Sequence, residues 1–174
     1  SRAVGGGHFG PPCSSWSRVR FKRPRPPPLR NRDWLWGLPP ERLSAKSRVK
    51  VRLANSLLMA SLILIEALRQ IGASWSLEHP ADPGRWPFPS IWVLDRVLKW
   101  SGAQGVKKLT FAQCMLGCPA QKMTTLLGVV DNLSVFDQPC VHRHHAQELA
   151  GLDENGRWRT RVTQAYPAPM CELL

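Results

Sequence analysis

The sequence predicts an α/β fold with a mainly parallel sheet, and three observations lead to this prediction. A long helical pattern covers residues 45–71, a short alternating stretch follows at 74–77, and a second helical pattern covers residues 90–100. Two further strand-like stretches then cover residues 106–114 and 123–130. Strands that alternate with helices along the chain are typical of α/β domains. At 174 residues the chain has about the length of one domain.

The first third of the chain is strongly basic. Residues 1–52 contain 13 Lys and Arg against only Asp33 and Glu41, whereas residues 53–174 contain 11 basic and 10 acidic side chains. Residues 18–40 are rich in Pro and Arg, which predicts an extended surface segment. This composition favours contact with phosphates of a nucleic acid. A solvated Arg/Pro tail without a partner is the alternative.

The predicted elements have clear boundaries. Ser44 is a suitable N-cap for the helix at 45–71, in which Val49, Leu53 and Leu57 begin an apolar series at helical spacing. Gly72 ends this helix, and the strand at 74–77 leads directly to Glu78. Residues 80–89 contain four prolines and form a loop. The longest apolar run, residues 57–65, is too short to span a bilayer, so we expect no membrane segment.

We divide the chain into three segments. Residues 1–43 hold a Pro-Pro-Cys loop and the basic segment, residues 44–130 form the α/β core, and residues 131–174 form a C-terminal segment that contains Cys and His. The five cysteines are an odd number without a paired spacing, so we expect a reducing compartment. No signal-peptide pattern follows Ser1. An intracellular protein of the nucleus or the cytoplasm is therefore expected.

Residues 10–17, Gly-Pro-Pro-Cys-Ser-Ser-Trp-Ser, form the most distinctive motif. Two adjacent prolines fix φ and keep the first of them out of the helical region, so the chain reaches Cys13 in a rigid, extended turn. Such a turn presents the thiol, which can then act as a nucleophile. A buried loop cysteine without chemistry is the alternative.

This motif resembles the catalytic loop of the cytosine-C5 DNA methyltransferases, where Pro-Pro-Cys, a polar residue, an aromatic residue and a serine carry the nucleophile. Two further elements follow in the family's order. The first, residues 78–80, resembles the motif in which a glutamate follows a strand, with His79 in place of the usual asparagine. The second, residues 113–125, resembles the segment that reaches the target base, although Met123 and Thr125 stand where arginines are expected. Agreement is better with a divergent branch of phage- and mobile-element-like methylase homologues.

The resemblance implies a partial doubly wound sheet and a DNA cytosine-C5 methyltransferase. In its reaction the thiolate of Cys13 adds to C6 of a flipped cytosine, Glu78 engages N3, and C5 takes a methyl group from S-adenosylmethionine. Because the thiolate is the nucleophile, we expect cations such as Arg18 or Arg20 to lower the pKa of Cys13. The residues that the resemblance assigns to substrate binding are Ser17, Arg18, Arg20, Gln121, Lys122 and Thr124. DNA is the expected partner, with RNA as an alternative.

The methyl-donor site is expected to be incomplete. The family's glycine loop for S-adenosylmethionine precedes its catalytic cysteine, yet only twelve residues precede Cys13. The three glycines at 5–7 lie too close to the thiol to form that loop. We therefore expect a domain that is incomplete or inactive by itself.

A non-catalytic nucleic-acid-binding remnant of a mobile element is the alternative function. It would use the basic segment together with a zinc-binding turn in the C-terminal segment. Residues 140–145 offer the candidate ligands Cys140, His142, His144 and His145. A complete site needs a distant cysteine, and the candidates are Cys114, Cys118 and Cys171. An exposed His-rich turn without metal is the other interpretation.

Overall fold

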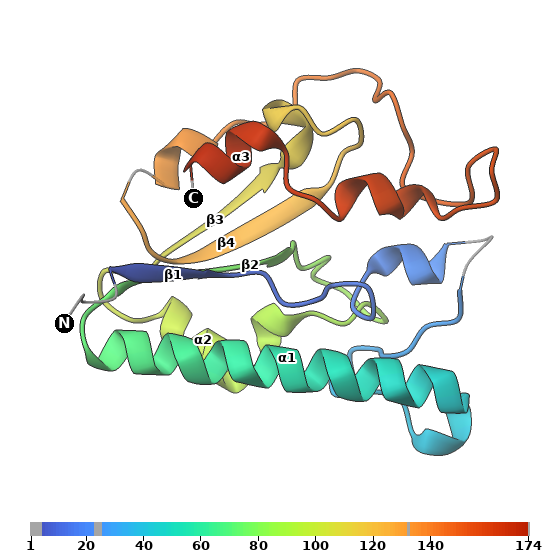
Figure 1. The fold of residues 1–174 in the computed structure, drawn as a ribbon, viewed down its shortest axis with the longest axis horizontal. Helices are drawn as coiled ribbons and strands as arrows, with labels where there is room; N and C mark the ends of the chain where they lie inside the picture. The colour runs from blue at the N-terminus through green and yellow to red at the C-terminus, as the bar shows by residue number, and fades with distance from the viewer. Residues whose placement is uncertain (1–4, 23–25, 132, 174) are drawn as a thin grey trace.

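A single mixed sheet forms the centre of the protein (Figure 1). The computed structural model describes residues 5–22, 26–131 and 133–173. In the described residues the strand order is β1-β2-β4-β3. The strands are β1 (Gly6–Phe9), β2 (Ser74–Pro80), β3 (Lys107–Ala112) and β4 (Met123–Val129), and the helices are α1 (Ala45–Gln70), α2 (Asp95–Ser101) and α3 (Ala168–Leu173). The α/β class predicted from the sequence is therefore observed.

The expected mainly parallel pairing is found only between β1 and β2. Phe9 lies opposite Leu77 in that parallel pair, whereas β4 runs antiparallel to both β2 and β3. The connection from β1 to β2 contains α1 and is long enough for a parallel crossover. Only residues 113–122 join β3 to β4, and Gly117 there takes a left-handed φ of 93°. Because this connection is short, β4 can only pair antiparallel to β3.

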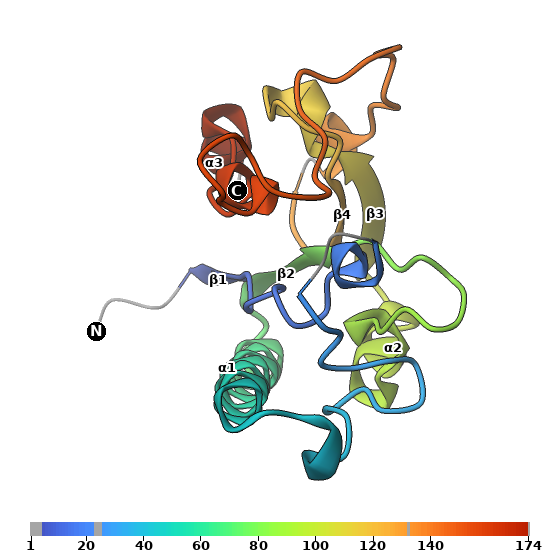
Figure 2. The ribbon, with the colours of Figure 1, turned by 90° about the vertical axis from the view of Figure 1, so that its right-hand side faces the viewer.

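Two hydrophobic cores lie on opposite faces of the sheet. The first packs α1 and α2 against Trp75, Leu77 and Leu127. The second packs Phe111 and Leu126 against the C-terminal segment, which includes Met170 of α3. Figure 2 shows α1 and α2 on one side of the sheet and α3 on the other. The three sequence segments thus contribute to one body, since β1 comes from the first and α3 from the last.

Helix α1 begins and ends close to the predicted positions, but it buries a different face. Ser44 caps it, with its hydroxyl accepting from the Ser47 N–H at 3.2 Å. The apolar series that predicted the helix does not form its core face, because Val49, Leu53, Leu57 and Leu64 are exposed. The residues that α1 buries are Val51, Ala54, Leu58, Leu62 and Ile65. Apolar residues occupy nearly every side of the helix around 57–65, so spacing alone did not select the buried side.

Among the described residues, α1 is long and apolar enough to cross a membrane by length and composition. The sequence had predicted no such segment. One such helix is weak support for a span, because a core helix of a globular domain meets the same criterion. In the structure one side of α1 packs in the first core.

The basic segment is part of the folded body rather than a separable arm. Arg30 is fully buried, and its guanidinium lies 4.3 Å from the ring centre of Trp16. It donates to Ser15 Oγ at 3.0 Å and to Asn55 Oδ1 at 2.7 Å. Leu29 and Leu43 form a small cluster with Val51. The described part of residues 18–40 is mostly at the surface, as expected, but Leu29 and Arg30 are buried and fix the segment against α1.

Candidate active site

The Cys13 turn follows β1 directly, and contacts of the neighbouring residues Ser15 and Trp16 fix its position. The Trp16 N–H donates to the Cys13 carbonyl at 2.9 Å, which closes the turn. Trp16 is buried in the first core, and Arg30 is bonded to the neighbouring Ser15. Cys13 itself is half-buried. The side chains around the turn therefore fix the position of the thiol.

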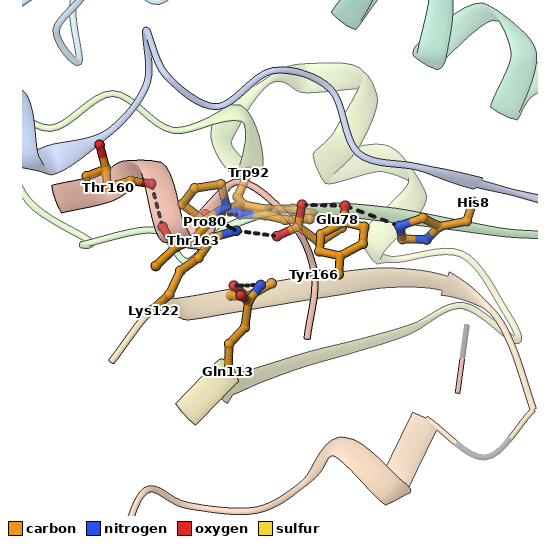
Figure 3. Close-up of polar contacts among 10 residues, drawn as sticks. His8, Glu78, Pro80, Trp92, Gln113, Lys122, Thr160, Thr163 and Tyr166 are labelled. Atoms are coloured by element: carbon orange, nitrogen blue, oxygen red, sulfur yellow. Dashed lines mark hydrogen bonds and ion pairs between the residues drawn. The ribbon is translucent and has the colours of Figure 1, made fainter. Parts of the chain in front are cut away.

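Glu78 lies beside this turn because β1 and β2 are parallel neighbours. Their pairing ends at Phe9 and Leu77, so the residues that follow this paired stretch, including Glu78 within β2, lie at the same end of the sheet as the Cys13 turn. Glu78 is buried and points toward the C-terminal segment (Figure 3). The charges of Glu78 and Lys122 both act on the pKa of Cys13. The structure therefore brings together the two residues that the resemblance assigns to catalysis.

The two oxygens of Glu78 have different surroundings. Oε2 accepts a hydrogen bond from the Tyr166 hydroxyl at 3.0 Å. Oε1 has no hydrogen-bond partner although it is buried, and it lies 3.8 Å from Lys122 Nζ. Burial raises the pKa of Glu78, while Lys122, Tyr166 and Thr124 lower it. Burial is the largest of these effects, so the pKa of Glu78 is raised overall, and its Oε1 has no hydrogen-bond partner.

The thiol is also favoured in its neutral form. Burial raises the pKa of Cys13, and Glu78 adds to this rise, whereas Lys122 opposes it. The expected lowering by Arg18 or Arg20 is not found. Arg20 instead donates to the carbonyls of Ser14 and Pro27 at 2.6 and 2.8 Å. Lys122 is thus the cation beside the thiol.

Lys122, Tyr166 and His8 complete the site (Figure 3). Lys122 Nζ donates to the Thr163 carbonyl at 3.2 Å, so the C-terminal segment holds its side chain. The Tyr166 hydroxyl also lies 3.3 Å from His8 Nε2, and His8 Nδ1 lies 2.7 Å from Ser76 Oγ. Sequence analysis did not predict Tyr166 or His8 as site residues. The contacts span most of the chain, and no local motif marks them.

His79 lies on the other face of the sheet and is fully buried. Burial lowers its pKa to about 3, and Lys122 and Arg30 act in the same direction. Its ring packs edge-on against Trp16 at a centroid distance of 5.9 Å. His79 therefore supports the Cys13 turn as a neutral ring packed against Trp16.

The other residues assigned to substrate binding divide into two groups. Thr124 is buried and accepts a hydrogen bond from Gln113 Nε2 at 3.0 Å, so it supports Glu78 rather than facing solvent. Ser17 accepts from the Val19 N–H and caps a short turn. Arg18 and Gln121 instead line a hollow of about 410 Å³ on the surface. Other residues that line it are Lys22, Arg143, His144 and His145.

A second cluster of reactive side chains lies in the C-terminal segment. The potential metal-ligand atoms of Cys114, Cys140, His142 and His145 all lie within 4.8 Å of one another. Three of the four predicted candidates therefore come together, and Cys114 is the distant cysteine. His144, in the same loop, is not part of this group.

No known protein family, curated protein or solved structure matches this chain. Its function must therefore be inferred from the site itself.

Proposed function

We propose that Cys13 and Glu78 form the cytosine-addition site of a cytosine-C5 methyltransferase-like domain. The observation that carries this proposal is their meeting at the carboxyl ends of two parallel neighbouring strands, with Lys122 beside both. Ligands of α/β sheets bind at this end of the strands. The motif resemblance adds that a thiol and a carboxyl group are the pair required to attack a cytosine ring.

The strand arrangement fits the resemblance only in part. The resemblance implies a mainly parallel sheet, whereas only β1 and β2 pair in parallel here and β4 runs antiparallel to β2 and β3. The order of the two residues agrees with the resemblance, because Cys13 follows β1 and Glu78 lies near the end of β2.

The chemistry of the site suits addition to C6. A protonated Glu78 donates a hydrogen bond to N3 and withdraws electrons from the ring, which makes C6 electrophilic. Cys13 loses its proton to solvent and forms the S–C6 bond, while the carboxyl proton moves to N3. The carboxylate left on Glu78 is then stabilised by Lys122 at 3.8 Å. The enamine so formed is nucleophilic at C5.

The described residues do not fit S-adenosylmethionine. Gly6 and Gly7 are strand residues of β1, and a Cβ on Gly6 would lie 2.8 Å from the Ser74 carbonyl oxygen. These glycines therefore serve close strand pairing rather than a donor loop. No step that uses the methyl donor is derived for this chain.

Tyr166 occupies the place where a base would bind. A Cβ on Gly10 would clash with its hydroxyl, and that hydroxyl is bonded to Glu78 Oε2. A cytosine that engages Glu78 must therefore displace Tyr166. The C-terminal segment that carries Tyr166 covers the site in this structure (Figure 3).

Hydrogen exchange at C5 tests this function without a methyl donor. Reversible thiol addition lets C5 of the enamine take a deuteron from D₂O and lose its own proton before the thiol leaves. We expect the cytosine H5 signal of a single-stranded oligonucleotide to decay in the presence of the protein, and Cys13→Ala to abolish the decay. Cys171→Ala, at an exposed cysteine, is the matched control. Equal decay with Cys13→Ala would refute the assignment.

The hollow near Arg18 favours a second function, non-catalytic nucleic-acid binding. Arg18, Lys22 and Arg143 line it, and their charges suit phosphates. Arg18→Glu combined with Arg143→Glu should weaken binding of an oligonucleotide and reduce its salt dependence, measured by fluorescence anisotropy. Binding that needs these arginines, without any H5 exchange, would favour this function over the catalytic one.

A further inference from the structure

We propose that Cys114, Cys140, His142 and His145 bind one Zn²⁺ ion in a closed, tetrahedral site. Cys140 Sγ lies 3.4 Å from Cys114 Sγ, 3.6 Å from His142 Nδ1 and 3.2 Å from His145 Nε2. Usual Zn–S and Zn–N bond lengths in a tetrahedron place such atoms about 3.3–3.8 Å apart. Cys140 therefore has nearly the zinc-site spacing to each of the other three side chains, and all four ligand atoms lie within 4.8 Å of one another.

The ligand types favour zinc in a structural role. Two thiolates and two imidazoles neutralise the ion's charge, and this set is common in structural zinc sites. Four protein ligands leave no open position for a substrate. Softer sulfur ligands disfavour Mg²⁺ and Ca²⁺, which bind oxygen.

The surrounding loop gives an independent reason for a metal. Residues 137–150 contain no helix or strand, and Val141 is 73% exposed, so apolar packing does little to fix this loop. Its Gln147 N–H donates to the Pro119 carbonyl at 3.0 Å. Cys114, by contrast, is buried beside β3. A zinc ion would fasten the loop to the sheet.

The position of Cys114 links this metal site to the candidate active site. Its neighbour Gln113 donates to Thr124 Oγ1, and Thr124 in turn acts on Glu78. The chain that continues from the zinc loop also carries Tyr166. Zinc would thus fix the position of Gln113, whose hydrogen bond to Thr124 supports Glu78. It would also fix the C-terminal segment that carries Tyr166. The binding of zinc itself does not depend on the proposed cytosine chemistry.

Metal analysis of the purified 174-residue chain, kept reduced, tests the proposal. We expect one zinc per chain after dialysis, and Co²⁺ substitution should give the visible spectrum of a tetrahedral site with thiolate charge-transfer bands. This spectrum is read on the unmodified chain and does not depend on whether a variant folds. Zinc below one tenth of an equivalent, or an octahedral Co²⁺ spectrum without thiolate bands, would overturn the proposal.

Variants then identify the ligands. Cys114→Ser, Cys140→Ser and His145→Ala should each weaken zinc binding at least about tenfold in a chelator competition. His144→Ala in the same loop and Cys118→Ser near Cys114 are the matched controls and should bind as the unmodified chain does. Weaker zinc binding in Cys118→Ser, with unchanged binding in Cys114→Ser, would show that the assigned ligand set is wrong. Chelation should also accelerate proteolysis within residues 131–173 and leave α1 protected.

Discussion

The hydroxyl of Tyr166 donates a hydrogen bond to Oε2 of Glu78 at 3.0 Å, although 88 positions separate the two residues in the sequence. Figure 3 shows that this bond joins the C-terminal segment to the central strand β2. Removing this bond should lower the free energy of unfolding, because Glu78 is buried and its other oxygen already lacks a hydrogen-bond partner.

Tyr166→Phe should destabilise the protein by about 1–2 kcal/mol, the usual cost of a lost buried hydrogen bond. The bond favours the charged carboxylate, so the cost should grow between pH 4 and pH 8, as Glu78 loses its proton. Urea unfolding at both pH values measures this difference. In a Glu78→Gln background the pH dependence of the cost should vanish. A cost that stays pH-dependent in that background would show that another group is responsible.

Glu78→Gln should change how stability depends on pH. The pKa of Glu78 is raised in the folded state, so the folded chain holds this proton above pH 4.5 where the unfolded chain releases it. The contribution of Glu78 to stability is therefore present at low pH and declines as pH rises through the folded pKa. Relative to the unmodified chain, Glu78→Gln should become more stable from pH 4 to 7. Glu148→Gln, at an exposed glutamate, should show no such trend.

His79→Asn should have the opposite effect on acid stability. The pKa of His79 in the unmodified chain falls from 6.5 to about 3 on folding, so the unfolded chain binds the proton first as pH drops. Stability is then lost between about pH 6.5 and 3, by about 4–5 kcal/mol in total if the whole shift applies. The variant should show a flatter decline over this range in thermal unfolding. His144→Asn is the control, and an equal flattening there would contradict the assignment.

Arg30→Lys should destabilise the fold by about 2–4 kcal/mol, although it keeps the charge. A lysine cannot bond Ser15, Leu35 and Asn55 at once as the guanidinium does. The turn that holds Cys13 should loosen, and Cys13 should react faster with a thiol reagent. Arg18→Lys, at an exposed arginine, should change neither stability nor reactivity. Unchanged reactivity in Arg30→Lys would mean that Arg30 does not hold this turn.

The sequence by itself determined the elements whose causes are local. The N-cap at Ser44 and the stop at Gly72 define α1, because capping and helical spacing act over a few residues. The strand before Glu78 was predicted at 74–77, but β2 runs three residues further and contains Glu78. The motifs of Glu78 and Cys13 nevertheless indicated two residues that lie near each other in the structure. The thiol and the histidines of residues 140–145 likewise indicated three members of the Cys/His cluster that Cys114 completes in the structure.

Only the tertiary structure decided which distant groups meet. The antiparallel insertion of β4, the burial of Arg30 and the choice of Cys114 over Cys118 depend on packing between segments far apart in the chain. The buried face of α1 was also decided by its contacts, since the helix is apolar on several sides. Tyr166 joins Glu78 for the same reason. A hydrogen-bond donor stabilises a buried carboxyl group, and folding rather than any local pattern brings the Tyr166 hydroxyl within reach of Glu78 Oε2.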